Sequence, residues 1–164
     1  MITYRPIVPT DNAEIAAVIR AVFREFGIDR PGTVYTDPTT DALYELFRSA
    51  GSAYWIAEEN GTIVGGCGIY PTPGRPEGCV ELVKFYVART HRGTGVGSAL
   101  LQKSIASARE LGYTQMYLES FPELSKAVSM YERAGFRPLD HALGNSGHFA
   151  CTLWMLMDLT TTDR

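Results

Sequence analysis

Three glycines stand within five residues of the chain, at Gly93, Gly95 and Gly97, and an apolar run with helical spacing follows them. Glycine lets a backbone approach a ligand closely, and the first turn of a helix carries N–H groups without intrahelical partners. The pattern therefore favours an anion such as a phosphate at this loop. A purely structural strand-to-helix turn is the alternative, because glycines at this spacing also occur in plain turns.

Two common nucleotide-binding patterns are not met in this chain. The dinucleotide fingerprint GxGxxG is absent, and the P-loop pattern fails because Ser98 follows Gly97 with no lysine between them. Both patterns also belong to an early strand-helix-strand unit, whereas strands that read as antiparallel come first here. An unrelated nucleotide-binding domain is therefore disfavoured.

The composition is that of an ordinary globular protein. Of 164 residues, 45% are hydrophobic and 20% are charged, which predicts one domain over residues 1–159 and a frayed tail over residues 160–164. The net charge of -3 and the lack of a Lys/Arg run disfavour a nucleic-acid partner. The sequence shows neither an apolar run long enough to cross a membrane nor a leader pattern, so we expect a cytoplasmic protein.

The three cysteines are spaced far apart in apolar contexts and without a CxxC pattern, at Cys67, Cys79 and Cys151. Such residues are usually buried, reduced thiols. We therefore expect neither a disulfide framework nor a cysteine-based metal site.

The first part of the chain reads as a strand, two helices and a hairpin. A strand is expected over residues 2–6, and a helix follows it with Asp11 and Glu14 at capping-box spacing. A second helix is expected to begin after Asp37 and Pro38. The run over residues 52–70 then reads as two strands joined by the turn Asn60-Gly61, a strong hairpin signal.

The second part alternates strands and helices. A strand over residues 79–88, a helix over 98–112 and a strand over 113–120 form a unit whose two strands should be parallel. A further helix over 123–135 and closing strands over 136–140 and 148–159 complete the chain. The expected fold is α+β, with a twisted, mostly antiparallel sheet of about seven strands, one parallel pair and about four helices.

The glycine loop and a second segment resemble the GNAT superfamily of acyl-CoA-dependent N-acetyltransferases. The family signature is Gln or Arg, two residues, Gly, one residue, then Gly or Ala, and the run from Arg92 to Gly97 fits every position. The segment YERAGF, from Tyr131 to Phe136, looks like the family's Y-E-K-x-G-F. The order of the expected elements is also similar to the family's order, so the resemblance covers nearly the whole chain.

The resemblance implies acetyl-CoA as cosubstrate and no metal. It implies that the pantetheine arm pairs with the backbone of Phe85, Tyr86 and Val87, where the strand separates from its parallel neighbour. It implies that the pyrophosphate lies on the loop and helix start, at Arg92, Gly93, Thr94, Gly95, Val96, Gly97 and Ser98. One position departs from the family: many members have an Asn seven residues before the tyrosine, and here that position holds Leu124. Ser125 or the backbone is left to make that contact.

Acetylation of an amine needs a base and an acid. A primary ammonium has an ordinary pKa of about 10.4, so a base must take its proton at pH 7, and a donor must protonate the leaving thiolate. Glu81 lies eleven residues before Arg92, where the resemblance implies a general base that acts directly or through water. Tyr131 matches the family's tyrosine, which implies the general acid. The alternatives are a Glu81 that is solvated or paired with Lys84, and a Tyr131 that is a core aromatic.

The histidines show no metal-binding spacing with one another or with the cysteines. His91 is expected to be solvated, whereas His141 and His148 flank a loop that often shapes the acceptor pocket in the family. The other candidates for the acceptor side are Glu119, Ser120, Tyr35, Tyr70 and Phe121.

The leading hypothesis is direct transfer of acetyl from acetyl-CoA to a primary amine of a small molecule or an amino acid. Acetylation of a protein lysine or N-terminus is an alternative that needs an open groove. A non-catalytic acyl-CoA sensor is another, and the presence of both Glu81 and Tyr131 argues against it. The sequence leaves open the acceptor, the length of the acyl group and whether the chain forms a homodimer.

Overall fold

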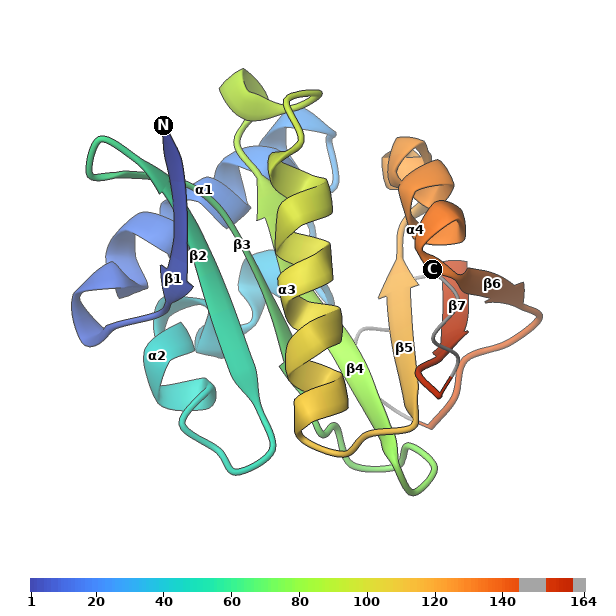
Figure 1. Cartoon of the computed structure of the whole chain (residues 1–164). Coiled ribbons are helices and arrows are strands. Elements are labelled where there is room, and N and C mark those ends of the chain that lie inside the picture. Colours follow the sequence, from blue (N-terminus) through green and yellow to red (C-terminus); the bar gives the residue numbers. More distant parts are fainter. Residues whose placement is uncertain (145–152, 161–164) are drawn as a thin grey trace.

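The computed structural model describes residues 1–144 and 153–160. In this part of the chain seven strands form one sheet in the order β1-β2-β3-β4-β5-β7-β6 (Figure 1). All neighbouring strands are antiparallel except β4 and β5, which are parallel. The strands are β1 Ile2–Pro6, β2 Ala53–Glu59, β3 Thr62–Tyr70, β4 Cys79–Val87, β5 Gln115–Ser120, β6 Phe136–Leu139 and β7 Leu153–Asp158. The predicted fold class is confirmed.

Four α-helices in the described residues cover the two faces of the sheet: α1 Asn12–Glu25, α2 Leu43–Leu46, α3 Val96–Glu110 and α4 Val128–Ala134. Helices α3 and α4 lie on one face, where Leu100 and Ile105 pack against the sheet in one core cluster. Helices α1 and α2 lie on the other face, where Ile19 and Phe23 belong to a second core cluster. The apolar stripes that predict these helices are thus the surfaces that they bury.

The hairpin between β2 and β3 is confirmed. Asn60 and Gly61 both have positive φ values, of 52° and 82°. This conformation suits a tight two-residue hairpin and favours Asn and Gly. The local sequence alone therefore determines this turn.

The predicted capping box at the start of α1 is wrong. Asp11 precedes the helix but accepts hydrogen bonds from the Arg5 guanidinium at 2.8 and 2.9 Å and from the Val8 N–H. Glu14 accepts from the N–H of Ile63 at 2.8 Å. Asp11 is thus held by residues that precede it, and Glu14 by a strand 49 positions away in sequence, so neither carboxylate caps α1.

Two helices are shorter than predicted. Asp37 caps a 3-10 helix over Pro38–Asp41, and α2 is a single turn that begins only at Leu43. The helix expected over residues 123–135 begins as a 3-10 segment with a non-helical residue at Leu124, so α4 begins at Val128. In both places a 3-10 segment replaces the first turns of the predicted α-helix.

Smaller differences concern the ends of elements. Helix α3 begins two residues before Ser98, and β5 begins at Gln115, two residues after the predicted start. The closing strand is described from Leu153, so its predicted first residues lie outside the described part of the chain. Residues 161–164 of the predicted tail also lie outside it.

A bulge in β4 and an early end to its pairing with β5 shape the middle of the sheet. Gly66 pairs with Tyr86 and Gly68 with Val83, so one residue of β3 faces two of β4, and Lys84 has a φ of 53°. The Tyr54 hydroxyl donates to the Lys84 carbonyl at 2.6 Å and holds this bulge. Strands β4 and β5 pair only over the first three residues of each, ending at Glu81. Beyond that point one edge of β4 is left without a neighbouring strand.

Cys67 and Cys79 are buried free thiols, as predicted, and burial raises the pKa of Cys67 to about 12. Cys151 lies outside the described residues. None of the helices within residues 1–144 and 153–160 is long and apolar enough to cross a membrane.

Candidate active site

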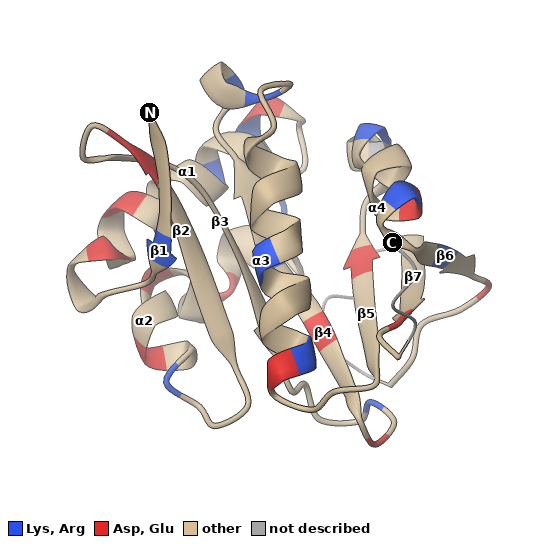
Figure 2. Cartoon of the chain, viewed as in Figure 1, with Lys and Arg blue, Asp and Glu red and all other residues tan. Residues whose placement is uncertain are grey.

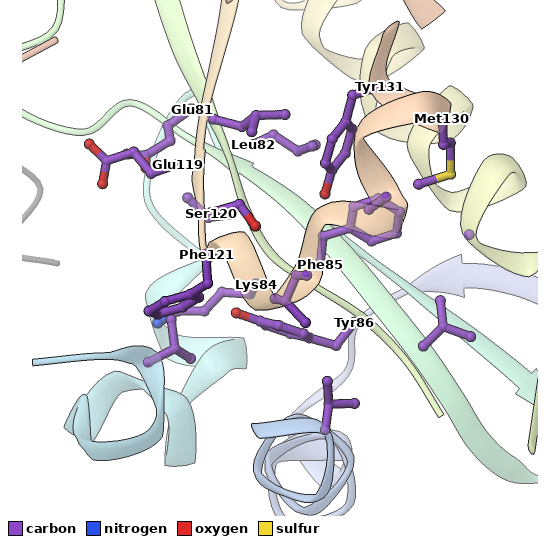
Figure 3. Close-up of a pocket in the computed structure, with 18 of the residues that line it drawn as sticks. Glu81, Leu82, Lys84, Phe85, Tyr86, Glu119, Ser120, Phe121, Met130 and Tyr131 are labelled. Atoms are coloured by element: carbon purple, nitrogen blue, oxygen red, sulfur yellow. The ribbon is translucent and has the colours of Figure 1, made fainter. Parts of the chain in front are cut away.

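A cleft of about 1000 Å³ opens where β4 and β5 separate. Residues 81–87 of β4, the end of β5, the glycine loop, the segment around α4, the last turn of α1 and parts of residues 34–39 line it. Figure 3 shows side chains from these elements pointing into one space. The cleft thus brings together residues that are far apart in the sequence.

The glycine loop leaves open space at one end of this cleft. Gly93 and Gly95 have positive φ values of 75° and 92°, and a Cβ atom at either would meet nothing within 4 Å. Gly95 is the residue before α3, and no side chain caps that helix. The amides of the first turn, which include Gly97 and Ser98, therefore offer donors to an anion. This geometry fits a pyrophosphate group.

Three other predicted residues of the loop have side chains that pack in the core or bond to other protein groups. The side chain of Val96 is buried in the core, and the Thr94 hydroxyl donates to the carbonyl of His91 at 2.5 Å. Arg92 forms a bidentate ion pair with Glu25 at 2.5 and 2.6 Å, and its Nε donates to the Val87 carbonyl at 3.2 Å. At Thr94 and Val96 the loop has only backbone groups to offer a ligand.

Phe85, Tyr86 and Val87 line the cleft along the edge of β4 that β5 does not cover. On the other edge β4 pairs with β3 up to Val87. Every second N–H and C=O group of an edge strand faces away from its partner strand. The structure therefore leaves backbone donors and acceptors at the place predicted for a pantetheine arm.

Glu81 is buried in the cleft and is neither solvated nor paired with Lys84, so both alternatives drawn from the sequence are wrong. It is 3% exposed, and its Oε1 accepts from the Thr72 hydroxyl at 2.6 Å and from Arg75 Nη2 at 2.9 Å. Burial raises the pKa of Glu81, while Arg75 and Thr72 lower it and nearby Glu119 raises it further. The balance leaves the carboxyl pKa above its usual value.

Tyr131 extends from α4 into the cleft. Its ring packs edge-on against Phe85 and Phe136, with centroids 6.1 and 5.7 Å apart, and the residue is 7% exposed. Figure 3 shows the hydroxyl pointing into the space between Ser120 and Phe85. Burial raises the pKa of this hydroxyl, so it holds its proton at neutral pH. Tyr131 is thus both a core aromatic and a possible donor in the cleft.

A second ion pair, between a buried lysine and a partly exposed aspartate, lies in the cleft on the side of α1 and α2. Lys84 Nζ is 3.3 Å from Asp37 Oδ2 and 3.4 Å from the Thr39 hydroxyl, and its side chain is 4% exposed. Burial lowers the pKa of Lys84, and Asp37 raises it. The bulge at Lys84 interrupts the alternation of β4 and places this side chain on the face that also holds Val83 and Tyr86.

The other predicted residues divide into two groups. The cleft is lined by Glu119, Ser120, Tyr70, Phe121 and Leu124, the residue that occupies the usual Asn position. The lining includes neither Tyr35, which packs against Phe23, nor His141, which is exposed. His91 is not simply solvated, because its Nε2 lies 2.8 Å from Glu59. His148 and the side chain of Ser125 lie outside the described part of the structure.

Comparison with known proteins now identifies the family. Residues 15–136 match the acetyltransferase (GNAT) family. The chain is 40% identical over 150 residues to the uncharacterized N-acetyltransferase YjgM of Escherichia coli (strain K12). The alignment covers 91% of this chain and 90% of that protein. This chain belongs to the GNAT acetyltransferase family. It is therefore an acyltransferase enzyme.

Solved structures agree with the GNAT fold. The crystal structure of a GNAT acetyltransferase of Staphylococcus aureus Mu50 superimposes with a TM-score of 0.85 at 22% identity. The superposition covers 98% of this chain and 100% of that one. The structure of yncA from Salmonella typhimurium, solved with its cofactor acetyl-CoA, has a TM-score of 0.74 at 19% identity and covers 100% of this chain and 97% of its own. The chain is also 32% identical to N-acetyltransferase 8B and 36% identical to N-acetyltransferase 8 of Rattus norvegicus. Those matches cover 77% and 63% of this chain but only 54% and 47% of the two rat proteins.

Sequence reasoning missed Arg75 in this GNAT enzyme. Arg75 lies in the Pro/Gly-rich loop between β3 and β4, six residues before the glutamate that it contacts. A loop residue has no periodicity that predicts its direction, so no local pattern pointed to it. Figure 2 shows an acidic band on β4 and another at the end of β5, and Arg75 contacts a glutamate of each strand.

The bulge at Lys84 was also missed, because a regular strand accounts for the sequence equally well. Glu81 and Lys84 are the two charged residues of an otherwise apolar strand. Three positions apart, they would face opposite sides of a regular strand.

Among the described residues, no group of three His, Cys, Asp or Glu side chains is arranged to hold a metal.

Proposed function

We propose that this GNAT enzyme transfers the acetyl group of acetyl-CoA to a primary amine of a small molecule or an amino acid. The observation that carries the proposal is a single cleft with an unhindered glycine loop at one end and the buried pair of Glu81 and Tyr131 along its wall. When bound, acetyl-CoA would supply an activated acetyl thioester. The residues of the chain would supply binding, orientation and proton transfer.

The cofactor end would bind mainly through the backbone. The amides at the start of α3, with the open approach at Gly93 and Gly95, suit the pyrophosphate. The uncovered edge of β4 at Phe85, Tyr86 and Val87 suits the amides of the pantetheine arm. The similarity to yncA, solved with acetyl-CoA, supports this assignment.

Glu81 is our proposed general base, acting directly or through a water molecule. An amine attacks only after losing its proton, and a general base contributes about 10²- to 10⁴-fold to such a rate. The raised pKa of Glu81 makes it a better proton acceptor than an ordinary surface carboxylate, provided that it is ionised. Arg75 and Thr72 favour the ionised form.

Tyr131 is our proposed general acid. Its hydroxyl keeps its proton at neutral pH because burial raises its pKa, and it faces the same cleft as Glu81. A donor of this kind can protonate a leaving thiolate. A backbone N–H of β4 near Tyr86 would stabilise negative charge on the acetyl oxygen.

The experiment that tests the proposal is release of the CoA thiol from acetyl-CoA, measured with a colour reagent over amines, amino acids, aminoglycosides and basic peptides. Release that depends on a small amine, with the acetylated product seen by mass spectrometry, is the expected result. Release with peptides alone would assign the enzyme to protein acetylation. Tight acetyl-CoA binding without release for any acceptor would contradict the proposal and favour a sensor.

A further inference from the structure

One arginine joins two buried carboxylates in the wall of the cleft. Arg75 Nη2 donates to Glu81 Oε1 at 2.9 Å and lies 3.5 Å from Glu119 Oε2. The side chains of Arg75, Glu81 and Glu119 are only 1%, 4% and 5% exposed. They come from the loop before β4, from β4 and from the end of β5, and Figure 3 shows the two glutamates next to each other. A single cationic nitrogen thus serves both carboxylates.

The surroundings hold this arrangement in place. The Thr72 hydroxyl donates to Glu81 at 2.6 Å, and the Tyr117 hydroxyl donates to Glu119 Oε2 at 2.9 Å. The guanidinium carbon of Arg75 lies 4.3 Å from the centre of the Tyr117 ring. Because the stacked ring and the hydroxyl belong to one side chain, Arg75 and Glu119 are positioned together.

Two of the three guanidinium nitrogens of Arg75 lack hydrogen-bond partners among the described residues. Its Nε and Nη1 atoms are buried and have no hydrogen-bond partner in the described structure. Leaving buried donors unpaired costs free energy, and such groups need an explanation when they occur in a native fold. The contact of Nη2 with the two carboxylates supplies that explanation here.

Resting on the proposed function, we propose that Arg75 and Glu119 are positioning residues that set the basicity of Glu81 in opposite directions. Arg75 keeps the buried Glu81 ionised, so that it is ready to accept a proton. Glu119 shares the same nitrogen and adds a like charge, so that Glu81 is not stabilised so strongly that it becomes a poor base. A base works best when its pKa lies near the working pH, which burial or an unshared arginine alone would not achieve.

The other titratable neighbours of Glu81 do not replace this pair. Lys84, on the same strand, is held by Asp37 at 3.3 Å. Cys79 is buried at the start of β4, and burial raises the pKa of its thiol, so it carries no charge at neutral pH. Thr72 and Tyr117 are uncharged donors. Arg75 and Glu119 are therefore the charged groups in this part of the structure whose removal acts most directly on Glu81.

The test is a carbon-13 NMR titration of the glutamate side-chain carboxyls in the cofactor-free protein, with the Glu81 signal assigned by its loss in Glu81→Gln. Arg75→Gln removes the cation and should move the Glu81 midpoint to higher pH. Glu119→Gln removes the like charge and should move it to lower pH. A charge within about 4–6 Å typically changes a carboxyl pKa by about 1–3, well above the error of such a titration.

Two controls separate charge from structure. Arg75→Lys keeps the positive charge and should return the midpoint most of the way to the wild-type value. Glu77→Gln removes a negative charge from the same loop at an exposed position and should leave the midpoint unchanged. If Arg75→Gln fails to fold, the direction of the shift in Glu119→Gln decides the question.

Opposite shifts support the proposal, and shifts of the same sign or none for both variants overturn it. Because the titration uses no acetyl-CoA, it is independent of the proposed function, which fails if no amine is acetylated by the wild type. The acid limb of kcat/KM against pH should move with the NMR midpoint in each variant. A midpoint that moves while the limb stays in place would show that Glu81 is not the base, and would overturn the positioning role.

Discussion

The two ends of the cleft are built in different ways. At the glycine loop most of the groups available to a ligand belong to the backbone, and two glycines with positive φ keep that backbone accessible. At the other end the groups are side chains in ion pairs, the fully buried pair of Glu81 and Arg75 and the buried Lys84 with the partly exposed Asp37. The difference teaches that the proposed cofactor end depends mainly on chain conformation, whereas the proposed acceptor end depends on particular residues from several elements.

The charges at the two ends also differ in burial. The ion pair between Arg92 and Glu25 has side chains that are 31% and 26% exposed, so water screens it. The side chains of Arg75 and Glu81 are 1% and 4% exposed. Breaking a buried pair leaves an uncompensated charge in the interior, which costs far more. Substitutions at the acceptor end should therefore affect chemistry and stability together, and those at the loop should affect binding.

Gly95→Glu should give the largest effect. The new side chain enters the open space of the loop and adds a negative charge next to the proposed pyrophosphate site. Two like charges about 4 Å apart repel by about 4 kcal/mol near a protein surface. We therefore expect the dissociation constant for acetyl-CoA, measured by calorimetry, to rise at least about 100-fold.

Gly112→Glu is the matched control for this variant. Gly112 also has a positive φ, of 87°, and open space around its Cβ position, but it follows the far end of α3. Its acetyl-CoA affinity should remain within about twofold of the wild type. An equal loss in both variants would attribute the effect to backbone strain and would refute the loop as the anion site.

Glu81→Gln should lower kcat/KM by about 10² to 10⁴ at pH 7, the usual contribution of a general base. Because the pKa of Glu81 is raised, the wild type should lose activity as the pH falls and the carboxyl takes up a proton. The loss in the variant should shrink toward pH 10, where roughly a quarter of the amine is already deprotonated, compared with less than about 0.1% at pH 7. A loss of the same size at every pH would remove the base assignment.

Tyr131→Phe should lower kcat by about 10² and change acetyl-CoA affinity by less than about twofold. The ring contacts with Phe85 and Phe136 remain in this variant, so only the hydroxyl is removed. Steady-state kinetics and thermal unfolding are measured side by side. A lower melting temperature with an unchanged kcat would assign Tyr131 to the core alone.

Glu25→Gln should give the smallest effect, and in the opposite direction. Glu25 holds the Arg92 guanidinium, which is then less available to a pyrophosphate. An exposed ion pair is worth about 0–1 kcal/mol, so acetyl-CoA affinity should rise by up to about fivefold. Glu110→Gln, at the exposed end of α3, controls for the change in net charge. The same gain in affinity in both variants would show that net charge is the cause, and would contradict the release of Arg92 from Glu25 to the pyrophosphate.

Much of the fold was predictable because it is encoded locally. The turn at Asn60 and Gly61 and the alternation of strand, helix and strand around the glycine loop depend on residues that are close in sequence. One error fell where a distant partner decides the structure, and another where the chain is locally irregular. Glu14 bonds to Ile63, which replaces the capping box, and the irregular segment at Leu124 delays the start of α4.

The site divides in the same way. The glycine loop could be predicted because close approach of a backbone depends on residue type alone. Arg75 could not, because its role depends on where a loop returns to the sheet. Lys84 could not be placed either, because a regular strand would put it on the face opposite Glu81, and only the structure shows the bulge and the contact with Asp37.

The most direct test asks whether binding depends on the glycine loop and acetyl transfer on Glu81. For Gly95→Glu and for Glu81→Gln, we would measure the dissociation constant for acetyl-CoA and the single-turnover rate of acetyl transfer at saturating amine. We predict that Gly95→Glu loses acetyl-CoA binding. Glu81→Gln should bind acetyl-CoA within about twofold of the wild type, while its transfer rate falls by about 10² or more. Equal losses of binding in both variants, or an unchanged transfer rate in Glu81→Gln, would contradict this prediction.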